Sequence, residues 1–113
     1  MIRVNYRADG RRRALIVKGH ANYAKKGQDL ICAAASILVY TAAQEAREAQ
    51  ERGRLTEPAK IRLGQGDAVV SFEAGGDLGG NEVCTAFRTI MTGFRILADS
   101  YPKNIKVSVE DNE

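Results

Sequence analysis

Short segments in which apolar and polar side chains alternate open the chain. Residues 2–6 read Ile-Arg-Val-Asn-Tyr, and residues 13–18 form a second apolar-rich run beyond Asp9 and Gly10. Alternation with a period of two is typical of a strand with one buried face, and Asp-Gly is a common hairpin turn. The first eighteen residues therefore predict a β-hairpin.

A longer hydrophobic period follows a polar stretch. Residues 22–28 have neither period and predict a loop. From Asp29 to Ala49, apolar residues recur every three or four positions, with charged residues between them. This spacing predicts an amphipathic helix that begins at Asp29 and ends at Gly53, ahead of Pro58, and its many alanines predict close packing.

The second half of the chain repeats this plan. Residues 60–63 and 67–73 flank Gly-Gln-Gly and predict another hairpin, and residues 75–80 are rich in glycine and predict a loop. Asn81 is a suitable cap for a second helix, whose apolar stripe covers residues 83–98.

A last strand is predicted over residues 105–109, after Pro102. The order ββαββαβ indicates an α+β fold, with two helices packed on an antiparallel or mixed sheet. A length of 113 residues fits one domain, so we expect residues 1–113 to form a single unit.

The composition narrows the function classes. The 17 basic and 14 acidic residues leave a net charge of +3, a small excess for an obligate nucleic-acid binder. The run Arg11, Arg12 and Arg13 is expected at a solvated hairpin tip. No apolar stretch reaches the roughly 20 residues of a membrane span, and no signal-peptide pattern opens the chain, so a cytoplasmic protein with two free thiols is expected.

One of these thiols lies where chemistry is favoured. With Asp29 as N-cap, Cys32 is the third helical residue, in the turn whose free N–H groups favour an anionic side chain. The Asp29 carboxylate can accept a hydrogen bond from the Cys32 backbone N–H, and Ser36 lies one turn further along the same helix face.

The chain's one histidine, His20, lies 12 residues before Cys32. An imidazole that the intervening loop brought to the thiol would remove its proton, and the thiolate could then attack a carbonyl group. Cys84 lies at the same distance from Asn81 as Cys32 from Asp29, so helix position does not choose between the cysteines; the apolar neighbours of Cys84 favour a core role.

Neither a metal site nor a phosphate-binding loop is predicted. Two cysteines 52 positions apart and one histidine fit no zinc spacing, since zinc ligands usually come in close pairs. Residues 75–80 lack the Gly-Lys-Ser/Thr ending of a P-loop. We therefore expect no cofactor.

Two segments resemble a known family. The string Gly19-His20-Ala21, followed by Gly27 and residues 29–36 (Asp-Leu-Ile-Cys-Ala-Ala-Ala-Ser), is similar to the ribosomal-processing cysteine proteases known as Prp, and the resemblance covers essentially the whole chain. Valine is common in the family where this chain has Ala35. The resemblance implies a catalytic dyad of His20 and Cys32. It also implies three supporting or substrate-binding residues, Gly19, Asp29 and Ser36.

The same resemblance implies a substrate and an assembly. Family members remove an N-terminal extension from the twenty-seventh protein of the large ribosomal subunit, act as homodimers, and are thought to order the loop between the dyad residues when peptide binds. A peptide partner is therefore expected, with no membrane and no requirement for nucleic acid.

Two other functions stay open at this point. A non-catalytic module could bind the ribosome or RNA through basic side chains, and this binding would weaken steeply with salt. A redox-sensing thiol protein could use Cys32, with Cys84 approaching it in space. The cations available to the binding module are Arg11, Arg12, Arg13, Lys25 and Lys26.

Overall fold

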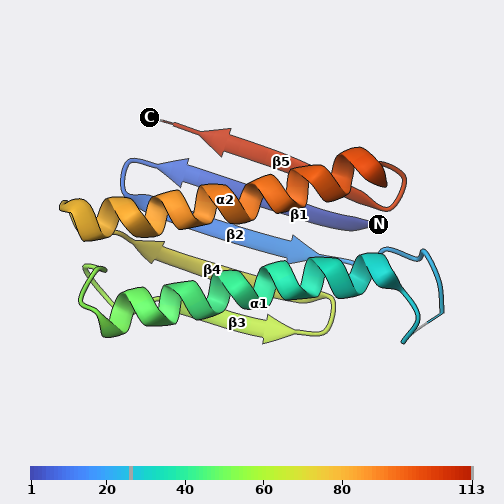
Figure 1. Ribbon diagram of the computed structural model, residues 1–113, viewed down its shortest axis with the longest axis horizontal. Coiled ribbons are helices and arrows are strands. Elements are labelled where there is room, and N and C mark those ends of the chain that lie inside the picture. Colours follow the sequence, from blue (N-terminus) through green and yellow to red (C-terminus); the bar gives the residue numbers. More distant parts are fainter. Residues whose placement is uncertain (26, 113) are drawn as a thin grey trace.

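In the computed structural model, which describes residues 1–25 and 27–112, two helices cover one face of a five-stranded sheet (Figure 1). The elements follow the predicted ββαββαβ order and confirm the α+β fold. Their bounds are β1 Ile2–Asp9, β2 Arg12–Lys18, α1 Leu30–Glu51, β3 Lys60–Gly64, β4 Asp67–Glu73, α2 Leu78–Ser100 and β5 Ile105–Asp111.

The sheet is mixed. Its strand order is β3-β4-β2-β1-β5, and β1 pairs in parallel with β5 whereas the other neighbours are antiparallel. The first and last strands thus lie side by side, with Ile2 opposite Ile105. Both predicted hairpins, β1–β2 and β3–β4, are present.

The core lies between the sheet and the helices. Alternate residues of β1, beginning with Ile2, are buried beneath the helices, as the period of two predicts. Phe72 of β4 and Phe87 of α2 meet edge to face with ring centroids 4.8 Å apart. Five alanines of α1 are buried in the core, namely Ala35, Ala42, Ala43, Ala46 and Ala49. Gly93 of α2 contacts Leu38 so closely that a Cβ would lie 2.8 Å from Leu38 Cδ2. Small residues therefore allow this close packing.

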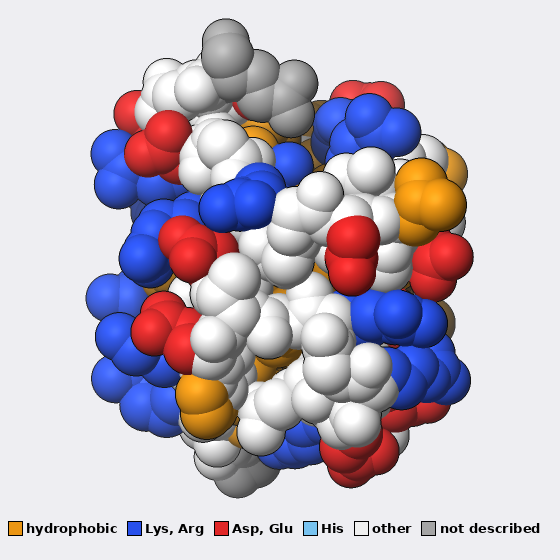
Figure 2. All heavy atoms as spheres, turned by 90° about the vertical axis from the view of Figure 1, so that its left-hand side faces the viewer, with side chains coloured by type: hydrophobic (Ala, Val, Ile, Leu, Met, Phe, Trp, Pro, Cys, Tyr) orange, Lys and Arg blue, Asp and Glu red, His pale blue; other side chains and the backbone are white. Residues whose placement is uncertain are grey.

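The opposite side of the sheet carries no helix, and we call it the helix-free face. Arg3 of β1 lies opposite Lys18 of β2 and opposite Lys106 of β5, and all three side chains are exposed. Figure 2 shows basic side chains, interspersed with acidic ones, along its left-hand margin, where this face lies. Three cations thus stand side by side on three neighbouring strands.

The start of α2 differs from the prediction. Its N-cap is Asp77, which accepts a hydrogen bond from the Gly80 N–H at 3.0 Å, and not Asn81. The last three residues of the glycine-rich segment are therefore helical and not loop. Tight packing requires glycine there, because a Cβ on Gly80 would overlap the Gly75 carbonyl oxygen. Cys84 consequently lies seven residues after its cap, and the parallel with Cys32 is lost.

The arginine run is also only partly a hairpin tip. Arg13 is 8% exposed, because the alternation of β2 turns it toward the helices, and its guanidinium donates to the carbonyl oxygens of Gly10 at 2.6 Å and Arg12 at 2.8 Å. Arg12 forms an ion pair with Glu73 on β4, at 3.1 Å. Of the three, only Arg11 lies in the turn.

The loop predicted over residues 22–28 contains neither helix nor strand in its described residues, 22–25 and 27–28. Lys26, one of the cations considered for RNA contact, lies outside the described residues. None of the helices described combines the length and the apolar character that a membrane crossing requires.

Candidate active site

The first turn of α1 presents Cys32 as the sequence predicts. Asp29 is the N-cap, and its Oδ1 accepts hydrogen bonds from the backbone N–H groups of Ile31 at 3.1 Å and Cys32 at 3.0 Å. Cys32 is the third residue of the helix and is half-buried. Its sulfur therefore lies in the turn that favours negative charge.

The same carboxylate holds the preceding loop. Its Oδ2 accepts from the N–H groups of Tyr23 at 3.0 Å and Ala24 at 3.4 Å. Desolvation raises the pKa of Asp29, but the hydrogen bonds donated by Cys32, Tyr23 and Ala24 together outweigh it, so the pKa lies below the ordinary 3.8. Asp29 is thus an anion at neutral pH that joins the loop to the helix.

A glycine turn places His20 at the end of β2. Gly19 has a φ of +94°, and a Cβ there would overlap the Met1 carbonyl oxygen. Its N–H donates to the carbonyl oxygen of Gly66 at 2.9 Å. The exposed His20 imidazole then lies against Gly66, where a Cβ would be 2.6 Å from Nε2.

The residue after His20 contacts the thiol directly. The Ala21 N–H donates to Cys32 Sγ at 3.4 Å, and the Ala21 carbonyl oxygen accepts from the Asn104 side-chain amide at 3.0 Å. Among the described residues, the His20 imidazole and the Cys32 thiol form no hydrogen bond with each other. The fold therefore brings the His20 backbone to Cys32, while the imidazole lies against the β3–β4 turn.

Ser36 and Cys84, the other candidate residues, lie in different environments. Ser36 lies one turn after Cys32 on α1 and is exposed, and no side-chain hydrogen bond of Ser36 is found in the described part of the chain. Cys84 is half-buried and packs against the hydrophobic core, in agreement with the predicted structural role.

Two residues of this site are missed by sequence reasoning. Asn104 lies 83 positions from its partner Ala21, and no local pattern connects them. Gly66 carries a turn signal, which predicts the β3–β4 hairpin but not the imidazole packed against it. Only strand pairing brings these positions together.

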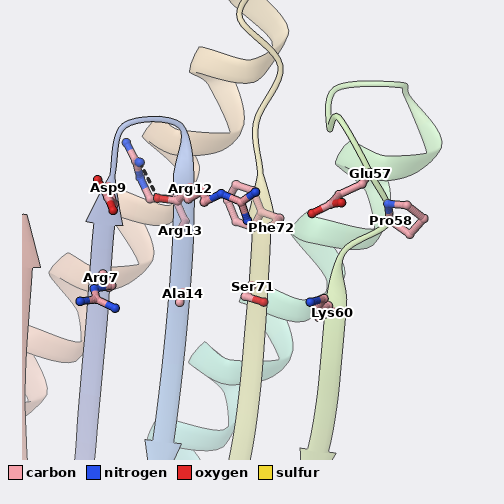
Figure 3. Close-up of a pocket in the computed structure, with 10 residues that line it drawn as sticks. All are labelled: Arg7, Asp9, Arg12, Arg13, Ala14, Glu57, Pro58, Lys60, Ser71 and Phe72. Carbon is pink, nitrogen blue, oxygen red and sulfur yellow. Dashed lines mark hydrogen bonds between the residues drawn. The ribbon is translucent and has the colours of Figure 1, made fainter. Parts of the chain in front are cut away.

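A pocket of about 260 Å³ lies at the other end of the sheet, between the β1–β2 hairpin and the segment before β3 (Figure 3). Its walls include Arg7, Arg12, Glu57, Lys60 and Ser71. It contains neither cysteine nor histidine, so it is not part of the candidate active site.

Comparison with known proteins identifies the family. The model of the family described as cysteine protease Prp matches residues 1–106. The chain belongs to the Prp family of cysteine proteases. The ribosomal processing cysteine protease Prp of Mycoplasma genitalium is 30% identical over 99 residues, which cover 88% of this chain and 90% of the relative.

Two solved structures of the S. aureus ribosomal processing protease Prp share the fold. One holds a covalently linked product peptide and superposes with a TM-score of 0.76 at 18% identity, covering 97% of this chain and all of the other. The second holds a substrate peptide and gives a TM-score of 0.68 at 19% identity, with the same coverage. The fold predicted from the sequence is therefore that of Prp, and the chain is a cysteine protease.

Proposed function

We propose that this Prp-family protease removes the N-terminal extension of the twenty-seventh protein of the large ribosomal subunit, with Cys32 as nucleophile and His20 as general base. One observation carries the assignment of these two residues. The thiol lies in the first turn of α1 and accepts the N–H of Ala21, the residue that follows His20. Cys84 has no comparable environment.

The reaction follows from ordinary acyl-transfer chemistry. The imidazole takes the thiol proton, and the Cys32 thiolate attacks the scissile carbonyl carbon to form a tetrahedral intermediate. The C–N bond then breaks, and the imidazolium gives its proton to the leaving amine. Water hydrolyses the thioester and releases the cleaved extension. Backbone N–H groups near the helix start are the candidate donors to the oxyanion.

Closure of the loop belongs to this proposal. The His20 imidazole lies against Gly66, so the dyad forms when the rest of the loop closes and the ring turns from Gly66 to the sulfur, while Ala21 keeps its contact with Cys32. Peptide binding supplies the free energy for this change, so the dyad is assembled only while peptide is bound. Gly19 supplies the turn, Asp29 holds the loop, and Ser36 is a candidate polar contact beside the sulfur.

The proposed assembly is a cytoplasmic homodimer of a single protease domain, residues 1–113, that needs no cofactor, membrane or nucleic acid. Leu30, Ile37 and Tyr40 are 73%, 62% and 57% exposed on the outward side of α1. These apolar side chains are the candidate contact between subunits, because burial of exposed apolar area drives association.

The RNA-binding alternative loses support. Two of its five cations are engaged within the fold, since Arg13 is buried and Arg12 pairs with Glu73. The proposed protease accounts for the helix-start thiol, which the binding module leaves unexplained.

A cleavage assay tests the proposal. The substrate is a synthetic peptide that spans the extension junction of the ribosomal protein from the same organism, and products are identified by mass. Cys32→Ala and His20→Ala should each lower kcat on the order of 10⁴-fold or more, whereas Cys84→Ala should cleave at the normal rate. Undiminished cleavage by Cys32→Ala would overturn the nucleophile assignment, and an intact peptide with the wild-type protein would overturn the substrate.

A further inference from the structure

We infer that Asn104 is a positioning residue of this protease, which holds Ala21 so that its N–H stays on the Cys32 sulfur and His20 stays beside it. The inference rests on the proposed roles of Cys32 and His20. Asn104 touches neither side chain in the described hydrogen bonds; it acts through Ala21, whose two backbone polar groups are divided between the Asn104 amide and the thiol.

Asn104 is itself firmly attached to the sheet. Its carbonyl oxygen accepts the Ile2 N–H at 2.8 Å, and its own N–H donates to the Tyr101 carbonyl oxygen at 2.9 Å. The residue directly precedes β5, which pairs with β1 from Ile2 onward. The side-chain amide therefore starts from the end of a paired strand, a more rigid support than a loop.

Ala21 has little freedom to find another partner. It is 2% exposed, so water has scarcely any access to its backbone. A buried carbonyl group requires a hydrogen-bond partner, and the Asn104 amide supplies it. Without this amide, the peptide unit that follows Ala21 would have to turn toward another donor.

Any such turn would reach both members of the dyad. The two peptide units meet at the Ala21 Cα, so a turn of the unit that carries the carbonyl group shifts that atom and the neighbouring unit, whose N–H lies on the sulfur and which begins at His20. A hydrogen bond to a thiolate is charge-assisted and stronger than one to a thiol, so the contact favours the reactive form. Asp29 anchors the later part of the loop, at Tyr23 and Ala24, and leaves Ala21 to Asn104.

Asn104→Asp is the sharpest test, because it keeps the shape and replaces the NH₂ donor with an oxygen that repels the Ala21 carbonyl group. The expected result is a kcat lower by about 10- to 100-fold, with KM within about threefold since the inferred role of Asn104 is to position the dyad and not to bind peptide. In a Cys84→Ala background, alkylation of Cys32 by iodoacetamide should slow at fixed pH. Asn81→Asp, an exposed position on α2, makes the same change of charge and should match the wild type.

A melting curve accompanies each variant, and rates are expressed per folded molecule. Asn104→Ala removes the donor without adding repulsion and should lower kcat and the alkylation rate in the same direction. Wild-type kcat and alkylation in both Asn104 variants would overturn the inference, as would losses that the folded fraction accounts for entirely. Cys32→Ala in the same assay separates the two claims: if it abolishes cleavage while the Asn104 variants cleave normally, only the positioning role fails.

Discussion

Gly66→Ala tests whether the β3–β4 turn sets the position of His20. Gly66 has a φ of +73°, and an added Cβ would lie 2.6 Å from the Nε2 atom of His20. Ordinary van der Waals contact begins at 3.4 Å, so the imidazole must move by about 0.8 Å or the turn must shift. Because His20 is exposed, the ring can move away at little cost in stability, and its position relative to Cys32 changes.

Gly66→Ala should affect both the stability of the protein and its catalytic rate. An L-residue in the left-handed region costs about 1–2 kcal/mol, and the melting temperature should fall by about 4 °C for each kcal/mol in a chain of this size. In the proposed mechanism the dyad forms when the imidazole leaves Gly66, so a Cβ at Gly66 destabilises the resting position of the ring and favours the catalytic one. Gly66→Ala should therefore lose a modest part of its stability and raise kcat/KM by up to about 10-fold.

Gly53→Ala is the matched control. Gly53 follows α1 with a φ of +70°, and nothing lies within 4 Å of its Cβ position. It therefore carries the same backbone strain without a contact to the imidazole. Peptide cleavage below saturating substrate, together with thermal melts, should show similar losses of stability in the two variants and a higher kcat/KM in Gly66→Ala alone. Equal cleavage rates per folded molecule would refute the link between Gly66 and His20.

Two further predictions concern stability. Asp29→Ala removes the α1 cap and should lower the free energy of unfolding by about 1 kcal/mol at neutral pH. Because the folded-state pKa of Asp29 is lowered, the stabilisation by its carboxylate is present above the ordinary pKa of 3.8 and is lost as the pH falls below that value. Urea melts of variant and wild type should therefore converge in acid, and a constant difference would contradict the assignment. Arg3→Thr removes the positive charge that lies between Lys18 and Lys106 and should stabilise the protein by about 0.2–1 kcal/mol. The gain in stability should shrink as salt is added to the melts.

Local signals were sufficient for the helix that carries the thiol. A cap and its partners lie within three residues of each other, so Asp29 and Cys32 could be placed from their spacing alone. The second helix had an equally plausible cap in Asn81. Asp77 is used instead because Gly80 must pack against the Gly75 carbonyl group, and the sequence does not reveal that contact.

Burial and long-range contacts account for the other differences. Three consecutive arginines favour a solvated turn, but the phase of β2 turns Arg13 inward, and that phase depends on its pairing with β1 and β4. The meeting of His20 with Gly66 and of Ala21 with Asn104 requires the complete strand order. The dyad itself remains a prediction, since its assignment comes from the family's motif and from the position of Cys32.

The parallel pairing of β5 with β1 also has a consequence for biosynthesis. Ribosomes deliver a chain from its N-terminus, so α1 and its thiol are made well before the last strand. The 72 positions between Cys32 and Asn104 take roughly 4–14 s to translate at ordinary rates. During that interval a nascent chain holds Cys32 without the amide that donates to the Ala21 carbonyl group. In the proposed mechanism the dyad is therefore fully positioned only once Asn104 and the strand that follows it have been made.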